Sequence, residues 1–177
     1  MATADRDTWI EAGLGTLAAE GVHGVRVERL ARDLGVTKGS FYWHFTDRAA
    51  LLDALLAAWE ARATDGVIAR LEASGAPPAD QLRQLVTLAF AVPPDLDRSV
   101  RAWASRDPRV SAVLAGVDGR RLATLERLFT EHGAGSPASR ARVLYAALVG
   151  EPLLHPAQTP EARVTMALEA LEGLLGP

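Results

Sequence analysis

The chain has 177 residues, of which 49% are hydrophobic, so it can bury a substantial core as one domain or as a small domain fused to a larger one. Because it contains no cysteine, a disulfide framework and thiolate metal or redox chemistry are excluded, and the composition fits a reducing compartment. No secretion signal and no run of about 18 apolar residues is present, so we expect a cytoplasmic protein that does not span a membrane.

Charge is distributed unevenly along the chain. The 19 basic and 22 acidic residues give a net charge of −3, whereas DNA-binding modules are commonly basic. Residues 22–48, however, hold five basic and three acidic residues, among them Lys38, the only lysine. Any surface that binds nucleic acid should therefore be confined to this segment.

The apolar residues recur at spacings of three and four, and no alternating run is long enough for a strand, so we expect an all-α fold. The first helix is predicted over residues 5–20 and ends at Gly21. Two short helices, over residues 27–34 and 38–44, are separated by a tight turn at Gly35. Two short helices joined by a glycine-containing turn are typical of a helix-turn-helix.

A longer helix is predicted from Asp47, an N-cap residue, to residue 73, and it should link two modules. Proline and glycine clusters then separate five more helices, predicted near residues 79–91, 96–106, 110–132, 138–154 and 161–175. The sequence therefore predicts about nine helices.

Residues 21–56 carry several residue types at fixed offsets. They are Gly21, Val27, Leu30, Ala31, Leu34, Gly35, Val36, Lys38, Gly39, Ser40, Phe41, Tyr42, His44, Phe45, Leu51 and Leu52. In this run the chain resembles the tetracycline-repressor (TetR) family of bacterial transcription regulators. The resemblance implies a three-helix DNA-binding domain over residues 1–47 and a helical ligand-binding and dimerisation domain over residues 48–177.

The resemblance also assigns a DNA-reading role to the helix over residues 38–44. Such a recognition helix enters the major groove N-terminus first, and Lys38 can donate to guanine O6 and N7. Gly39 lets the backbone approach DNA, while Arg48 is expected to hold the same strand. The expected DNA-contacting residues are Arg26, Thr37, Lys38, Gly39, Ser40, Tyr42, Trp43, His44 and Arg48.

Alternatives remain open for four of these residues. Arg26 stands where the family usually has a capping threonine or serine, so a cap worth about 1 kcal/mol is missing unless Arg26 serves a phosphate instead. Trp43 either contacts a thymine methyl group or covers the first helix. Tyr42 and His44 either donate to phosphate oxygens or form a capped surface pair.

A small-molecule effector and a homodimer are further implications of the resemblance. The candidate pocket residues, with core packing as the alternative for each, are Trp103 and Tyr145 first, then Trp59, Phe90 and Phe129. Two apolar stripes are the candidate dimer interface, with burial inside one chain as the alternative. They consist of Leu144, Ala147 and Leu148, and of Val164, Leu168, Leu171 and Leu175.

The predicted function is a ligand-responsive, homodimeric repressor that binds a near-palindromic double-stranded DNA operator and is released by a small molecule. No metal or cofactor is expected, because Pro152 disturbs the helix between Glu151 and His155 and no further ligand is evident. One alternative is a helical interaction module that has lost DNA binding. Another is a small helical enzyme, for which the sequence offers no convergent catalytic set.

Overall fold

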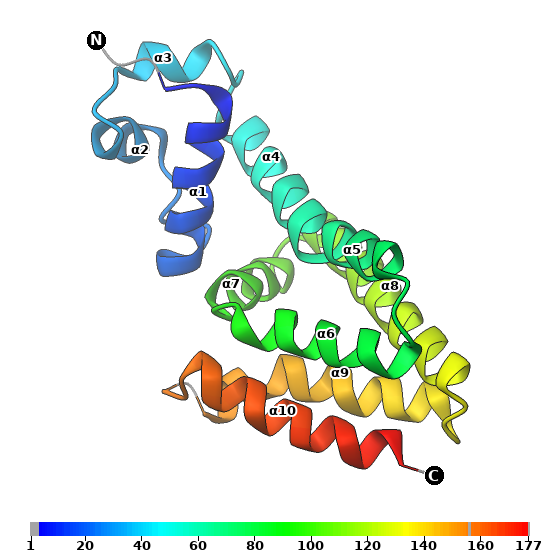
Figure 1. Cartoon of the computed structure of the whole chain (residues 1–177). Coiled ribbons are helices and arrows are strands. Elements are labelled where there is room, and N and C mark those ends of the chain that lie inside the picture. Colours follow the sequence, from blue (N-terminus) through cyan, green and yellow to red (C-terminus); the bar gives the residue numbers. More distant parts are fainter. Residues whose placement is uncertain (1–3, 156, 177) are drawn as a thin grey trace. The chain divides into compact units, whose positions relative to one another are not determined.

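A computed structural model describes residues 4–155 and 157–176 (Figure 1). Within these ranges the chain forms ten α-helices and one π-helical turn, and no strand, which confirms the predicted all-α fold. The helices α4 (Arg48–Glu60) and α5 (Gly66–Ser74) are joined without a break by the π-helical turn η1 (Ala61–Asp65). They form the single long helix predicted over residues 47–73, so the continuous helices number nine, as expected.

The chain divides into two compact units. Unit 1 holds residues up to 63 and 95–115, and unit 2 holds residues 64–94 and those from 116 onward. The chain passes from one unit to the other inside η1, between Pro94 and Asp95, and inside α8 (Pro108–His132). Unit 1 groups α4 and α7 (Asp95–Ala104) with the N-terminal helices by packing, so a functional division after residue 47 stays a prediction.

The first helices of unit 1 begin and end where local chemistry requires. Helix α1 (Arg6–Glu20) is capped by Asp5, whose Oδ1 accepts from the Thr8 backbone N–H at 2.8 Å, and it ends at Gly21 with φ of 71°. Asp47 caps α4 as predicted, accepting from the Ala50 N–H at 2.8 Å. The short helices α2 (Val27–Asp33) and α3 (Lys38–Tyr42) are joined by a turn with Gly35 at φ +67°, as a helix-turn-helix requires.

Aromatic packing holds α3 in place. Phe41 is fully buried, and its ring meets Trp9 of α1 edge-on with 5.3 Å between centroids. Phe45 stacks on the ring of Phe41 with 5.4 Å between centroids. Aromatic pairs of this geometry add about 0.5–1.5 kcal/mol beyond their burial, so the two phenylalanines anchor a helix only five residues long.

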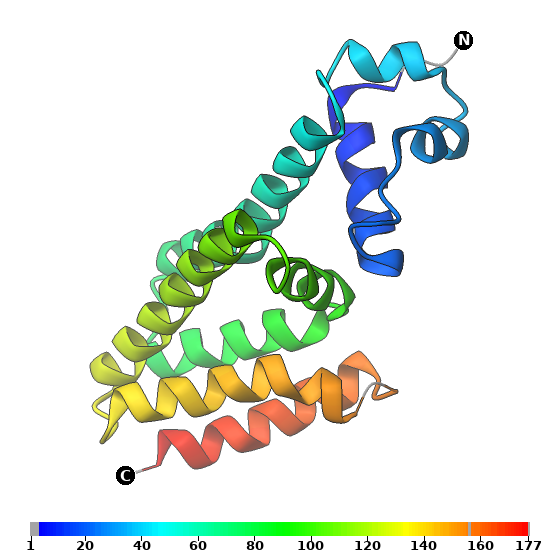
Figure 2. The same cartoon turned by 180° about the vertical axis from the view of Figure 1, so that it is seen from behind.

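The core of unit 2 is formed by α6 (Pro78–Ala91), the part of α8 in this unit, α9 (Pro137–Leu154) and α10 (Pro160–Leu175). Helix α10 packs along both α6 and α9, and Figures 1 and 2 show the three side by side. A buried ion pair lies at one point of this packing, where Arg163 Nε donates to Glu151 Oε2 at 2.9 Å. The same guanidinium donates to the Val92 carbonyl at 3.2 Å.

Two predicted dimer residues lie inside this core. Leu144 and Leu171 are buried among side chains of their own chain, because α9 and α10 turn these positions toward α6 and α8. Within the single chain, the alternative of intrachain burial describes both residues, and a dimer interface that includes them stays a prediction. Leu148, Val164, Leu168 and Leu175 are partly buried against the same core, and Ala147 is half-buried.

Candidate nucleic-acid interface

One side of α3 and its preceding turn is open to solvent. Thr37, Lys38, Gly39 and Tyr42 are exposed and Ser40 is half-buried, whereas Phe41 faces the core. A Cβ added at Gly39 would meet only Thr37 Oγ1, at 3.5 Å, so the backbone there is accessible. The predicted reading residues therefore share one accessible face.

Trp43 follows directly after α3 and is 87% exposed. An indole this exposed does not cover α1, so the packing alternative for Trp43 is wrong. Tyr42 is also exposed, and its ring meets Phe41 edge-on at 5.3 Å. Two adjacent aromatic side chains are therefore exposed at the C-terminal end of α3.

The lysine of this face has an acidic partner on α2. Lys38 Nζ lies 2.5 Å from Glu28 Oε1, and both side chains remain largely exposed. The hydrogen bond raises the pKa of Lys38 and lowers the pKa of Glu28, so both groups are charged at neutral pH. Sequence reasoning missed Glu28, because the contact depends on how α2 and α3 cross rather than on any spacing along one helix.

Two other predicted residues have partners inside the chain. Arg48 donates through Nε to the Val25 carbonyl and through Nη2 to the Val22 carbonyl, both at 2.6 Å. These bonds tie the Arg48 guanidinium to the loop between α1 and α2, and a contact of Arg48 with DNA stays a prediction. His44 Nε2 donates to the Ala4 carbonyl at 2.9 Å, which ties the N-terminal segment to the end of the helix-turn-helix.

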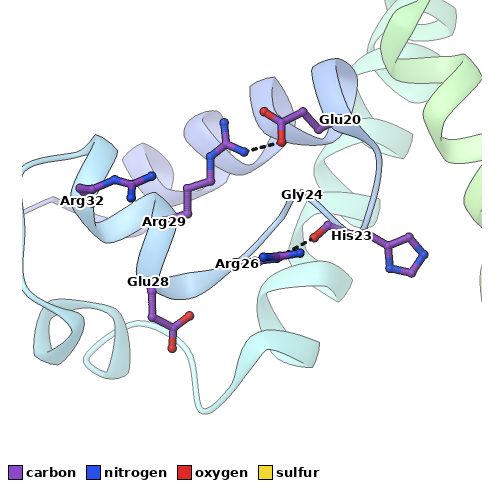
Figure 3. A pocket seen from close by; sticks show the side chains of 7 residues that line it. All are labelled: Glu20, His23, Gly24, Arg26, Glu28, Arg29 and Arg32. Carbon is purple, nitrogen blue, oxygen red and sulfur yellow. Dashed lines mark hydrogen bonds and ion pairs between the residues drawn. The ribbon is translucent and has the colours of Figure 1, made fainter.

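Beside α2 lies an open hollow of about 550 Å³ (Figure 3). Arg26 stands at the N-cap of α2 without a side-chain cap, as predicted, and its Nε donates to the His23 carbonyl at 3.2 Å. Arg29 pairs with Glu20 across the hollow, as Figure 3 shows. The residues lining it are Glu20, His23, Gly24, Arg26, Glu28, Arg29 and Arg32.

The five candidate pocket aromatics are all buried, and they fall into both units. Trp59 and Trp103 belong to unit 1, whereas Phe90, Phe129 and Tyr145 belong to the core of unit 2. Core packing therefore describes each of them in this structure. A pocket lined by them stays a prediction.

Tyr145 differs from the other four because its hydroxyl joins a chain of polar groups within unit 2. Tyr145 Oη donates to Asp118 Oδ1 at 2.6 Å and accepts from Arg121 Nη1 at 3.3 Å. Arg121 Nε also donates to the buried Thr64 hydroxyl at 3.1 Å. Burial is the main cause that raises the pKa of Tyr145, so its phenol stays neutral and keeps its proton for Asp118.

The described residues contain neither a cluster of potential metal ligands nor a candidate membrane-spanning helix. No group of three potential ligands gathers among residues 4–155 and 157–176, and the Glu151 carboxylate is paired with Arg163. Within the same ranges, no helix combines the length and apolar character needed to cross a bilayer.

Comparison with known proteins agrees with the helix-turn-helix assignment. Residues 10–55 match the family described as bacterial regulatory proteins, tetR family. The class D tetracycline repressor of Escherichia coli is 40% identical over 55 residues, which are 31% of this chain and 25% of that protein. The chain thus matches only about a quarter of the length of such relatives.

Solved structures match over nearly the whole chain. Reduced NemR from Escherichia coli aligns with a TM-score of 0.80 at 19% identity, covering 97% of both chains. A protein described as a transcriptional regulator from Saccharomonospora viridis, in complex with choline, aligns with a TM-score of 0.81 at 19% identity, covering 94% of this chain and 95% of that one. At this identity the likeness concerns the fold.

The short α2 and α3, the glycine turn between them and the exposed face of α3 together form a helix-turn-helix. Residues 10–55 also match the family profile and are similar to its curated members, so this segment is similar to the DNA-binding segment of TetR-family regulators.

Proposed function

We propose that the chain is a homodimeric transcriptional repressor that binds a near-palindromic DNA operator through α3 and releases it when a small molecule binds. The observation that carries this proposal is the accessible face of α3, where Thr37, Lys38, Gly39 and Tyr42 surround a helix anchored by buried Phe41. A helix N-terminus with small residues and one lysine suits the major groove, where Lys38 can meet guanine. Ser40, His44 and Arg26 are proposed to add further contacts with DNA around the exposed face of α3.

The homodimer is proposed to form through the outer face of α9. Val143, Ala147, Gly150 and Leu154 recur at spacings of four and three, and Val143 and Leu154 are exposed. Small residues in this stripe permit close approach of a second helix. Two-fold symmetry would then place two copies of α3 in successive major grooves, roughly 34–36 Å apart or a multiple of this distance.

Effector response is proposed to involve Tyr145, with Phe90 and Phe129 as apolar neighbours in unit 2. Ligand sites combine apolar walls with a few placed polar groups, and Tyr145, Asp118 and Arg121 supply such groups. The Saccharomonospora viridis regulator carries choline on a similar fold. Release of DNA needs a ligand that favours the non-binding state, and a preference of about 3 kcal/mol shifts occupancy roughly a hundredfold.

Selection of bound duplexes from random DNA by the full chain tests this proposal. We expect enrichment of a motif with two symmetry-related half-sites, and loss of binding when an effector is added from a small-molecule library. Binding that falls steeply with salt would separate a DNA-binding protein from an interaction module that has lost this activity. Failure to enrich any sequence would contradict the proposal.

A further inference from the structure

Lys38, the only lysine of the chain, forms an exposed ion pair with Glu28. Lys38 Nζ, on α3, lies 2.5 Å from Glu28 Oε1, on α2, with 52% and 65% of the two side chains exposed. The pair therefore stands at the edge where the two helices of the helix-turn-helix meet. Arg29 and Arg32 on the same helix pair with Glu20 and Asp33 instead, so the acidic partner of Lys38 is Glu28.

A carboxylate at this edge opposes binding to any DNA backbone. Phosphates repel it regardless of sequence, and it offsets the attraction exerted by Lys38. An acidic side chain gains an interaction in the major groove only where a base presents an amino group, and cytosine N4 is the usual donor to Glu or Asp. Glu28 thus weakens binding to most DNA sequences and strengthens it only where a base presents an amino group in the right position.

The two charges form an adjacent donor and acceptor. In the major groove a G·C pair presents guanine N7 and O6 as acceptors next to the cytosine N4 donor. Lys38 can donate to the guanine acceptors while Glu28 accepts from cytosine N4 of the same pair. Adenine also presents an acceptor and a donor, N7 and N6, but it offers Lys38 one acceptor rather than two.

We infer that Glu28 is a specificity-determining residue that reads, together with Lys38, one G·C base pair in each half-site of the operator. The inference rests on the proposed function, because it presumes that α3 enters the major groove. It assigns Glu28 to base reading and so accounts for an acidic group beside the lysine of a surface proposed to bind DNA.

The test compares selections from random duplex DNA by the wild-type chain and by Glu28→Gln, which keeps the side-chain size and removes the charge. Glu11→Gln is the matched control, because it removes one carboxylate charge from an exposed ion pair, with Arg62, that involves neither α2 nor α3. We expect wild type and Glu11→Gln to enrich a G·C pair at one symmetric position. Glu28→Gln should lose the preference for G·C at that position alone, because its amide keeps an acceptor for cytosine N4 but suits adenine N6 and N7 better.

Affinities measured by fluorescence anisotropy give the magnitude. Replacing this G·C pair by A·T should weaken wild-type binding roughly 10-fold or more, and should change Glu28→Gln binding much less. Glu28→Gln should also bind a scrambled duplex more tightly than wild type does. Lys38→Met should lose preference at the same base pair, a localised effect that a merely structural role for the ion pair would not produce.

The outcomes separate the inference from the proposed function. If the wild-type chain enriches a motif but Glu28→Gln enriches the same motif with unchanged base preferences, the inference is wrong and the proposed function stands. Enrichment of an A·T pair at the position sensitive to Lys38 also overturns the inference. If the wild-type chain enriches no sequence, both fall together.

Discussion

Gly13 of α1 lies so close to Leu55 of α4 that a Cβ added to Gly13 would stand 2.7 Å from Leu55 Cδ2. Leu55 is fully buried, so it has little room to move aside. Gly15, two residues further along the same helix, is exposed and has nothing within 4 Å of the position of its Cβ. Close packing thus explains one of the two glycines in α1, and the structure gives no reason for the other.

Replacing these glycines by alanine should therefore have opposite effects. Gly15→Ala should raise the free energy of unfolding by about 0.5–1 kcal/mol, because alanine loses less backbone entropy in a helix. Gly13→Ala should lower it, since overpacking costs about 1–3 kcal/mol and exceeds that gain. Urea unfolding of both variants measures the difference, and equal stabilisation by the two changes would contradict the observed approach of the helices.

Truncation of the exposed face of α3 should weaken DNA binding without unfolding the protein. Lys38→Ala and Tyr42→Ala should each reduce affinity for a selected operator roughly 10-fold or more. Both side chains are exposed, so the thermal unfolding temperature should stay close to that of wild type. Arg70→Ala, which removes a cation from an exposed position of α5, is the control and should leave affinity nearly unchanged. Operator affinity that survives either α3 change would remove that residue from the surface.

Breaking the buried ion pair of unit 2 should destabilise the fold strongly. Arg163→Met would leave Glu151 buried without its partner, at a cost of about 3–5 kcal/mol. The double variant Glu151→Leu, Arg163→Met should be more stable than Arg163→Met alone, because no unpaired charge remains. Arg127→Met, at an exposed ion pair with Glu131, should have a much smaller effect. A double variant as unstable as the sum of its single changes would argue against a coupled pair.

Alkaline pH should destabilise the protein through Tyr145. Its folded-state pKa is raised by burial above the usual value of about 10, so its contribution to stability is present below that pH and is lost as pH rises through the folded pKa. Tyr145→Phe should flatten the decline in stability above pH 10, and should cost about 0.5–1.5 kcal/mol at neutral pH by removing the hydrogen bond to Asp118. Urea unfolding from pH 8 to 11 measures both effects, and an identical pH dependence in the two proteins would refute the assignment.

A charge placed on the outer face of α9 should dissociate the proposed dimer. Leu154→Arg introduces a cation at a residue that is 75% exposed in the single chain, so it should not disturb the protomer itself. Sedimentation velocity should show wild type as a dimer and Leu154→Arg as a monomer. Thr87→Arg, at an exposed position of α6, should remain dimeric. Loss of the dimer in both variants, or in neither, would place the interface elsewhere.

The helices and the helix-turn-helix could be predicted from the sequence because local signals determine them. Asp47 as an N-cap, Gly35 in the turn and the apolar spacing through Phe41 all act within a few residues, and the structure confirms each. The missing cap at Arg26 followed from the residue type alone.

Contacts between segments far apart in the sequence could not be predicted from local signals. Trp43 is amphipathic, so its sequence position is equally compatible with burial and exposure, and the short length of α3 leaves it outside the core. Arg48 reaches carbonyls of the loop before α2, and Leu171 faces the core, because of how whole helices pack. Apolar spacing shows which side of a helix is buried, but it does not show whether the burying surface belongs to the same chain.

The most direct test of DNA reading by α3 is a salt titration of the wild-type chain with its selected duplex and a scrambled duplex of the same composition. At moderate salt we expect at least roughly 1000-fold tighter binding to the selected duplex, with both affinities falling linearly in a plot of log affinity against log salt concentration. Equal affinity for the two duplexes, or binding that does not respond to salt, would contradict the proposed function.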